Sequence, residues 1–130
     1  MNKKEILKSM LIDEVEIFKG LVSRAQIVFK LDQRGNAVFL VPFDSLTQRQ
    51  LIAMQLLGRY FANELELTNS DILTADELST LVHADKNSIT SRLHELKKEH
   101  VIESPGRGQF RISISGAERV LDEILSNLKS

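Results

Sequence analysis

The feature that most constrains this chain is a short break between two helical repeats of apolar residues. Apolar side chains recur three and four positions apart on both sides of it: Leu78, Leu81 and Val82 before the break, and Ile89, Leu93 and Leu96 after it. The break is His83-Ala84-Asp85, which has room only for a tight turn. The pattern therefore predicts two short helices joined at an angle.

Both helices have recognisable starts. Thr74 and Glu77 have the spacing of a reciprocal capping box, and Leu73 and Leu78 occupy the positions that clamp a helix entry hydrophobically. Asp85 is placed to cap the second helix, because its carboxylate can accept the free amides of the first turn and lies at the positive end of the helix dipole. We expect the first helix to begin at Thr74 and the second just after Asp85.

A β-hairpin is expected next. Residues 101–104 form its first strand, Pro105-Gly106-Arg107-Gly108 its turn, and residues 109–114 its second strand. The second strand alternates in a period of two, so that Phe110, Ile112 and Ile114 face inward. Ser115 and Glu118 repeat the capping-box spacing and predict a final amphipathic helix.

The first half of the chain predicts a helix, a hairpin and a second helix. Residues 3–22 carry apolar side chains at helical spacing, and the apolar runs 26–31 and 37–43 are separated by a polar loop that contains Gly35. Both faces of this hairpin are apolar, so one face should pack on the first helix and the other on something else, for which a second subunit is one candidate. After Thr47, which forms a capping box with Gln50, a largely apolar helix of about 20 residues should be the buried scaffold of the fold.

Length and composition restrict the class of protein. A chain of 130 residues is most economically one compact domain with an extension, which we divide into an N-terminal layer (1–45) and a main domain (46–130). Without cysteine there is no disulfide framework, thiolate metal site or thiol nucleophile. No signal peptide or membrane span is apparent, so we expect a cytoplasmic protein. No pattern typical of catalysis, of a metal site or of cofactor binding stands out, and we expect neither an enzyme nor a cofactor.

Charge is distributed unevenly along the chain. The net charge is −1, which by itself argues against a nucleic-acid binder, because phosphate contacts need clustered Lys and Arg. Residues 86–111, however, contain six Lys and Arg against three Asp and Glu, whereas residues 46–85 contain two against six. The positive block coincides with the second helix of the pair and the hairpin.

The order of these elements, and the segment LTADELSTLVHADKNSITSRLHELKKEHVIE in particular, resembles the winged helix-turn-helix superfamily and its MarR-like and related prokaryotic or archaeal transcription regulators. The resemblance covers about residues 47–128 and implies a mainly α protein with a small β component: a winged helix-turn-helix extended by an N-terminal helix and β-hairpin. In such proteins the helix at 86–99 lies in the major groove of double-stranded DNA and the wing at 101–114 approaches the flanking backbone or minor groove. The DNA-binding residues that it implies are Lys86, Asn87, Ser88, Thr90, Ser91 and His94 on the helix, and Arg107 and Arg111 on the wing.

Two departures from the family pattern stand beside this resemblance. His100 occupies the position between helix and wing where glycine is usual, because the backbone there is left-handed, and the recognition surface carries few arginines. Helical geometry supports the assignment, since Asn87, Ser91, His94 and Lys98 project opposite the apolar seam.

Other readings of these residues stay open. The alternative for the polar helix face is a solvated surface, and the alternative for the Arg107 turn is hairpin geometry alone; the position of these residues in the motif favours DNA contact over both. On the resemblance and the charge distribution, we expect a homodimeric, sequence-specific DNA-binding regulator, with a winged-helix protein–protein interaction module as the alternative. A small-molecule effector bound between the N-terminal layer and the scaffold helix is compatible with either.

Overall fold

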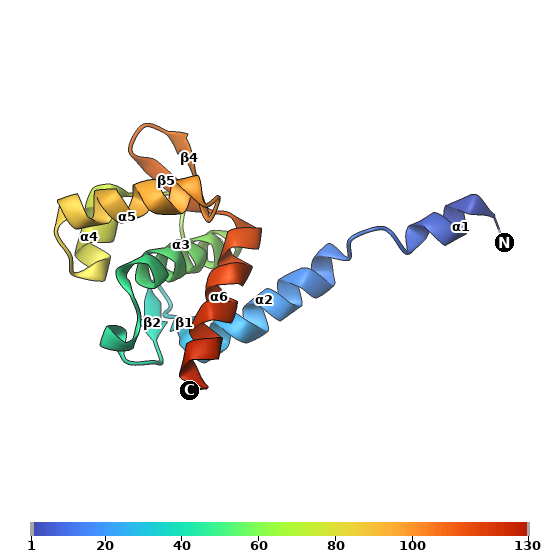
Figure 1. The fold of residues 1–130 in the computed structure, drawn as a ribbon, viewed down its shortest axis with the longest axis horizontal. Coiled ribbons are helices and arrows are strands. Elements are labelled where there is room, and N and C mark those ends of the chain that lie inside the picture. Colours follow the sequence, from blue (N-terminus) through green and yellow to red (C-terminus); the bar gives the residue numbers. More distant parts are fainter. Residues whose placement is uncertain (1, 130) are drawn as a thin grey trace.

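The computed structural model describes residues 2–129 as mainly helical, with two small antiparallel sheets (Figure 1). The expected class, mainly α with a small β component, is confirmed. The elements in chain order are α1 (Lys3–Lys8), α2 (Glu14–Val28), β1 (Phe29–Leu31), β2 (Ala37–Phe39), the short 3-10 helix η1 (Phe43–Ser45), α3 (Gln48–Glu64), β3 (Leu73–Thr74), α4 (Ala75–Val82), α5 (Lys86–Lys98), β4 (Ile102–Gly106), β5 (Gln109–Ile112) and α6 (Ile114–Leu128).

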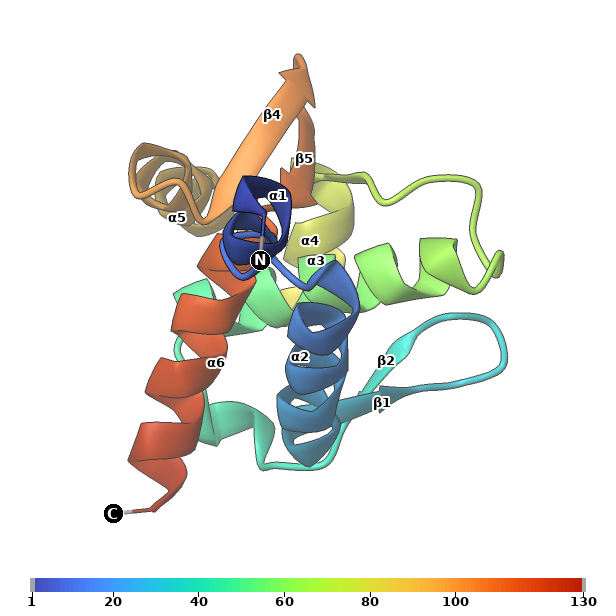
Figure 2. The ribbon, with the colours of Figure 1, turned by 90° about the vertical axis from the view of Figure 1, so that its right-hand side faces the viewer.

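The α3 helix is the centre of the fold, as predicted. Thr47 caps it through the expected capping box with Gln50, and every residue from Gln50 to Gly58 is buried. α4, α5, α6 and both sheets contact it. α6 also packs against α2 (Figure 2). Between these two helices the Arg24 guanidinium donates hydrogen bonds of 2.7 and 3.1 Å to the Asp122 and Glu118 carboxylates. The scaffold therefore places α4 and α5 on one side and α2 and α6 on another.

The two helices around the short break form as expected. Thr74 and Glu77 make both hydrogen bonds of the capping box, and the Asp85 carboxylate accepts the Ser88 amide at 2.8 Å. α4 ends at His83 and α5 is followed by His100, and both histidines have a left-handed backbone with φ of 59°. His100 therefore adopts the conformation for which glycine would be the more comfortable residue.

The predicted single helix over residues 3–22 is wrong. The chain forms α1 and α2 instead, separated by an irregular segment at residues 9–13. Asp13 has an extended backbone and its side chain accepts the Glu16 amide at 3.1 Å, so it starts a new helix rather than continuing the old one. No residue of α1 is buried.

The first hairpin is shorter than predicted. Residues 26–28 belong to α2, because Leu21, Ala25 and Val28 lie on one helical face that packs into the core. Tertiary packing therefore overrides the strand preference of this β-branched run. Only three residues on each side pair, with Phe29 opposite Phe39.

The second hairpin and the last helix also differ from the prediction in detail. Pro105 and Gly106 lie within β4, which is irregular between Glu103 and Gly106, since proline cannot donate to the ladder. α6 is capped by Ser113 rather than Ser115, so Ile114 is helical, not a strand residue. A further strand that was not predicted, β3, pairs with β5 and gives the sheet order β3-β5-β4.

None of the helices within residues 2–129 combines the length and apolar content that crossing a membrane requires.

Candidate nucleic-acid interface

α5 is fixed to the scaffold by an apolar seam and by ion pairs. Its inward side chains are almost fully buried: Ile89, Leu93 and Leu96. Arg49, in the first turn of α3, donates two hydrogen bonds to the Glu99 carboxylate and one of 3.4 Å to Glu95. These contacts with the Arg49 guanidinium hold the pKa of Glu99 below its usual value. Arg119 of α6 donates hydrogen bonds to the main-chain carbonyls of Glu99 and His100, at 3.0 and 3.4 Å, and so fastens the end of α5.

The opposite side of α5 is a polar surface. Four of the predicted contacts share it and have exposed side chains: Asn87, Thr90, Ser91 and His94. Lys98 lies on the same face three turns along from Asn87, because residues 11 positions apart on a helix point in nearly the same direction. This face therefore displays side chains of the kinds that form hydrogen bonds with base edges and phosphates.

Two of the predicted helix contacts are engaged within the chain. The Ser88 hydroxyl lies 3.2 Å from the Asp85 carboxylate, so this half-buried side chain belongs to the helix cap. Lys86 Nζ lies 3.1 Å from Asp76 Oδ1 of α4, in an exposed ion pair. Exposed pairs contribute little to stability, so Lys86 can exchange this carboxylate for a phosphate at small cost.

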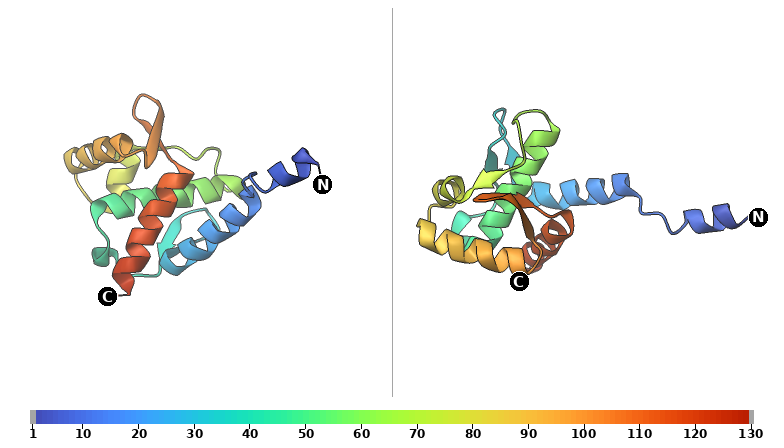
Figure 3. Two further views of the ribbon diagram at one scale, coloured as in Figure 1. Left: turned by 45° about the vertical axis from the view of Figure 1, so that its right-hand side comes forward. Right: turned by 90° about the horizontal axis from the view of Figure 1, so that it is seen from above.

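The β4–β5 hairpin stands beside α5 and projects beyond it, as Figure 1 and the left view of Figure 3 show. Its tip is Arg107-Gly108, where Gly108 has φ of 71°, a backbone conformation that side chains disfavour. Within residues 2–129 the exposed Arg107 side chain has no hydrogen-bond or ion-pair partner. Arg111, the other predicted wing contact, donates a 2.9 Å hydrogen bond to Glu103 on the facing strand. Arg107 is therefore the freer of the two cations.

The acidic side chains of the positive block are paired with cations. Glu95 and Glu99 contact Arg49, Glu95 also lies 3.1 Å from Arg92, and Glu103 contacts Arg111. The cations of the block that have no ion-pair partner in the described part of the chain are Lys97, Lys98 and Arg107. The local positive charge is thus presented outward, on the last turn of α5 and on the hairpin tip.

Lys97 and Lys98 were not among the predicted contacts. A helical projection already places Lys98 with Asn87, but only the ion pairs of the structure distinguish it from Lys86 and Arg111, which have partners.

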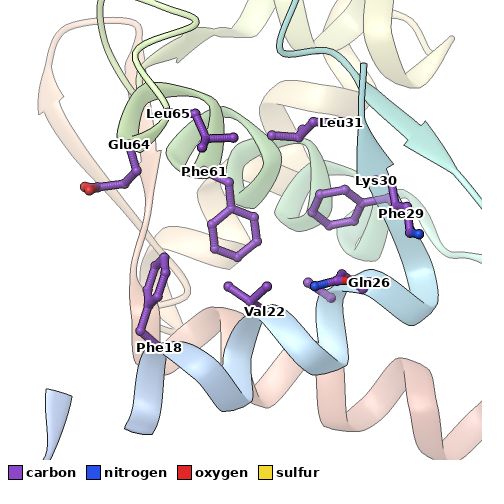
Figure 4. A pocket seen from close by; sticks show the side chains of 10 residues that line it. Phe18, Val22, Gln26, Phe29, Lys30, Leu31, Phe61, Glu64 and Leu65 are labelled. Carbon is purple, nitrogen blue, oxygen red and sulfur yellow. The ribbon is translucent and has the colours of Figure 1, made fainter. Parts of the chain in front are cut away.

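An apolar cavity lies apart from these residues. A groove of about 630 Å³ opens between α2, β1 and the end of α3 (Figure 4), and no residue of α5 lines it. It is located between the N-terminal layer and the scaffold helix, where an effector site was anticipated, and whether a small molecule binds there stays a prediction. The three histidines do not converge: His83, for example, packs its ring 5.6 Å from that of Phe43. Within residues 2–129 no three side chains form a group that could hold a metal ion.

Comparison with known proteins finds no matching family model, no similar curated protein and no similar solved structure. The functional argument therefore rests on the geometry and charge of this chain.

Proposed function

We propose that this chain is a winged helix-turn-helix protein that binds double-stranded DNA and regulates transcription in the cytoplasm as a homodimer. In this proposal α4 and α5 are the helix-turn-helix and the β4–β5 hairpin is the wing. α5 enters the major groove with its polar face, and Arg107 at the wing tip reaches the flanking backbone or minor groove.

The observation that carries the proposal is the outward display, beside a polar helix face, of cations that have no ion-pair partner within residues 2–129. Lys97 and Lys98 end α5 and Arg107 ends the hairpin, whereas the acids between them are held by arginines. Asn87 and Ser91, exposed in the first half of α5, can form hydrogen bonds with base edges. Cations at the end of a hydrogen-bonding helix face and on the adjoining hairpin match the division of labour in DNA recognition, in which phosphate contacts position the protein and base contacts specify the sequence.

The salt dependence of binding to labelled duplex DNA tests the proposal. Each cation that neutralises a phosphate contributes about 0.9 to the slope of log K against log salt concentration. Lys98→Ala and Arg107→Ala should each reduce the slope by about that amount and weaken binding to all sequences alike. Binding that is insensitive to salt, or unaffected by the double substitution, would refute the proposal.

Arg34 provides a matched control. It precedes Gly35 in the loop between β1 and β2, just as Arg107 precedes Gly108 between β4 and β5, and its side chain is likewise exposed. Arg34→Ala removes the same charge from the other hairpin and should leave the slope close to that of the unmodified protein.

A protein–protein interaction module is the second candidate function. It is favoured by a run of exposed apolar side chains at the N-terminus, which a DNA reader does not need for contact with DNA. A stable complex with another protein, together with no measurable affinity for duplex DNA, would support this alternative over the first.

A further inference from the structure

The N-terminal segment projects from the body of the molecule. We define the arm as residues 2–17, which comprise α1, the irregular segment and the first turn of α2; Figure 1 shows α1 far from every other element. Six apolar side chains of the arm are 57% to 77% exposed: Ile6, Leu7, Met10, Leu11, Ile12 and Val15. An isolated helix as short as α1 is not stable in water by itself, so the arm needs a surface to cover it.

The groove between α2, β1 and α3 is a surface of matching character. Aromatic and aliphatic side chains from all three elements line it: Phe18, Val22, Phe29, Leu31, Phe61 and Leu65 (Figure 4). Phe18 packs edge-on against Phe61, with ring centroids 5.9 Å apart, so this wall is structured in the single chain. Leu65 at the rim remains 63% exposed.

The charges beside these two apolar surfaces are complementary. α1 carries Lys3, Lys4 and Lys8 against Glu5. The rim of the groove, where α3 ends, carries Glu64, and Glu66 follows two residues later. Near the same end of α3 the Glu64 and Asp71 carboxylates add to burial in raising the pKa of Tyr60. The basic α1 thus corresponds to the acidic α3 end of the groove, while the later part of the arm carries Asp13, Glu14 and Glu16 and the β1 side of the groove carries Lys30.

The arm also continues directly from α2, which forms one wall of the groove. α2 runs unbroken from Glu14 through Phe18, so the arm leaves along the axis of the helix that forms one wall of the groove. To reach its own groove, α1 would have to reverse direction within residues 9–13. In a pair with two-fold symmetry, the arm of each copy would instead lie in the groove of the other, and both copies would make the same two contacts.

We propose that two copies of this chain exchange arms, each laying the apolar side of its arm into the groove between α2, β1 and α3 of the other. Arm exchange rests on the proposed function, because it says how the two chains of the proposed homodimer pair. It is tested without DNA, so that DNA binding and arm exchange can fail separately.

The experiment measures association of the full chain by sedimentation across a concentration series. Leu11→Asp disables the arm and Leu65→Asp disables the groove, and both residues are exposed, so each variant should retain the helical circular-dichroism spectrum of the unmodified chain. Each substitution should raise the dimer dissociation constant at least about tenfold. Leu128→Asp, at an exposed leucine on α6 outside the groove, is the control and should leave it unchanged.

Mixing the two variants distinguishes exchange from other arrangements. A dimer formed from one copy of each contains one intact arm on one intact groove, whereas neither variant alone has any. The mixture should therefore associate more tightly than either variant by itself. Any of three results would overturn the proposal: the unmodified chain is monomeric, Leu11→Asp leaves association unaffected, or the mixture associates no more tightly than its components. The last result would indicate that each arm folds onto its own chain.

Discussion

Two glycine-to-alanine substitutions should change stability in opposite directions, because the added methyl group would meet backbone atoms at one glycine and open space at the other. Gly116 lies in the first turn of α6, and a Cβ added there would come within 2.4 Å of Val101 Cα and 2.7 Å of Val101 O. Gly20 lies inside α2, where an added Cβ meets no atom within 4 Å.

The magnitudes follow from these distances. Carbon atoms pack best at about 3.5–4.0 Å, so Gly116→Ala must push α6 and Val101 apart by about 1 Å, and no side-chain rotation can relieve a contact with backbone. Overpacking of this kind costs about 1–3 kcal/mol, and the 2.9 Å hydrogen bond from the Ser113 amide to the Val101 carbonyl is weakened as well. Alanine also favours the helix over glycine by up to about 1 kcal/mol, which offsets part of this cost. We expect Gly116→Ala to lower the unfolding free energy by about 2 kcal/mol, and Gly20→Ala to raise it by about 0.5–1 kcal/mol.

Urea unfolding followed by circular dichroism measures both variants. Protein concentration must be the same throughout, because association shifts apparent stability. The expected loss for Gly116→Ala corresponds to a fall in Tm of about 7 °C. If Gly116→Ala were neutral, or stabilised the protein as Gly20→Ala does, the close approach of α6 to Val101, just before β4, would be refuted, and with it the placement of the β4–β5 hairpin beside α5.

Two further outcomes concern how α4 and α5 are held. Thr74→Ala removes the capping box of α4 and should cost about 1 kcal/mol in urea unfolding, whereas Thr80→Ala, an exposed threonine inside α4, should cost much less; equal losses would contradict the capping role. The pKa of Glu99 is lowered in the folded chain by Arg49, so its contact stabilises the fold above the ordinary carboxyl pKa and is lost as pH falls through the lowered value. The unmodified chain should therefore lose more stability than Glu99→Gln between about pH 6 and about pH 3.5, and identical acid profiles would show that the pair does not act in this way.

The elements that could be predicted from the sequence are those whose signals are local. Thr47 with Gln50, and Thr74 with Glu77, each lie within one helical turn, so their capping boxes could be recognised without knowing the fold. Residues 26–28 and Ser113 were assigned wrongly because distant contacts decide them: Val28 packs in the core, and the Ser113 amide bonds the carbonyl of Val101. β3 is too short to have a pattern of its own and exists because β5 pairs with it.

The residues of the candidate interface could likewise be predicted from the sequence only in part. The exposure of Asn87, Ser91 and His94 follows from helical periodicity, and the structure agrees. Which cations are free does not follow from spacing, because Lys86 and Arg111 are paired through contacts between different elements. The exposure of the arm could not be predicted from the sequence, because its apolar residues have the same helical spacing as those of a buried helix.

The central claim is that α5 and the wing tip together contact DNA. The most direct measurement is a map of backbone amide chemical shifts as duplex DNA, selected from a random pool for binding, is added to the full chain. The largest changes should fall on residues 86–98 and 104–109, with residues 2–17 and 29–39 nearly unchanged. Changes confined to the arm and groove, or absent from α5 and the wing tip, would contradict the account.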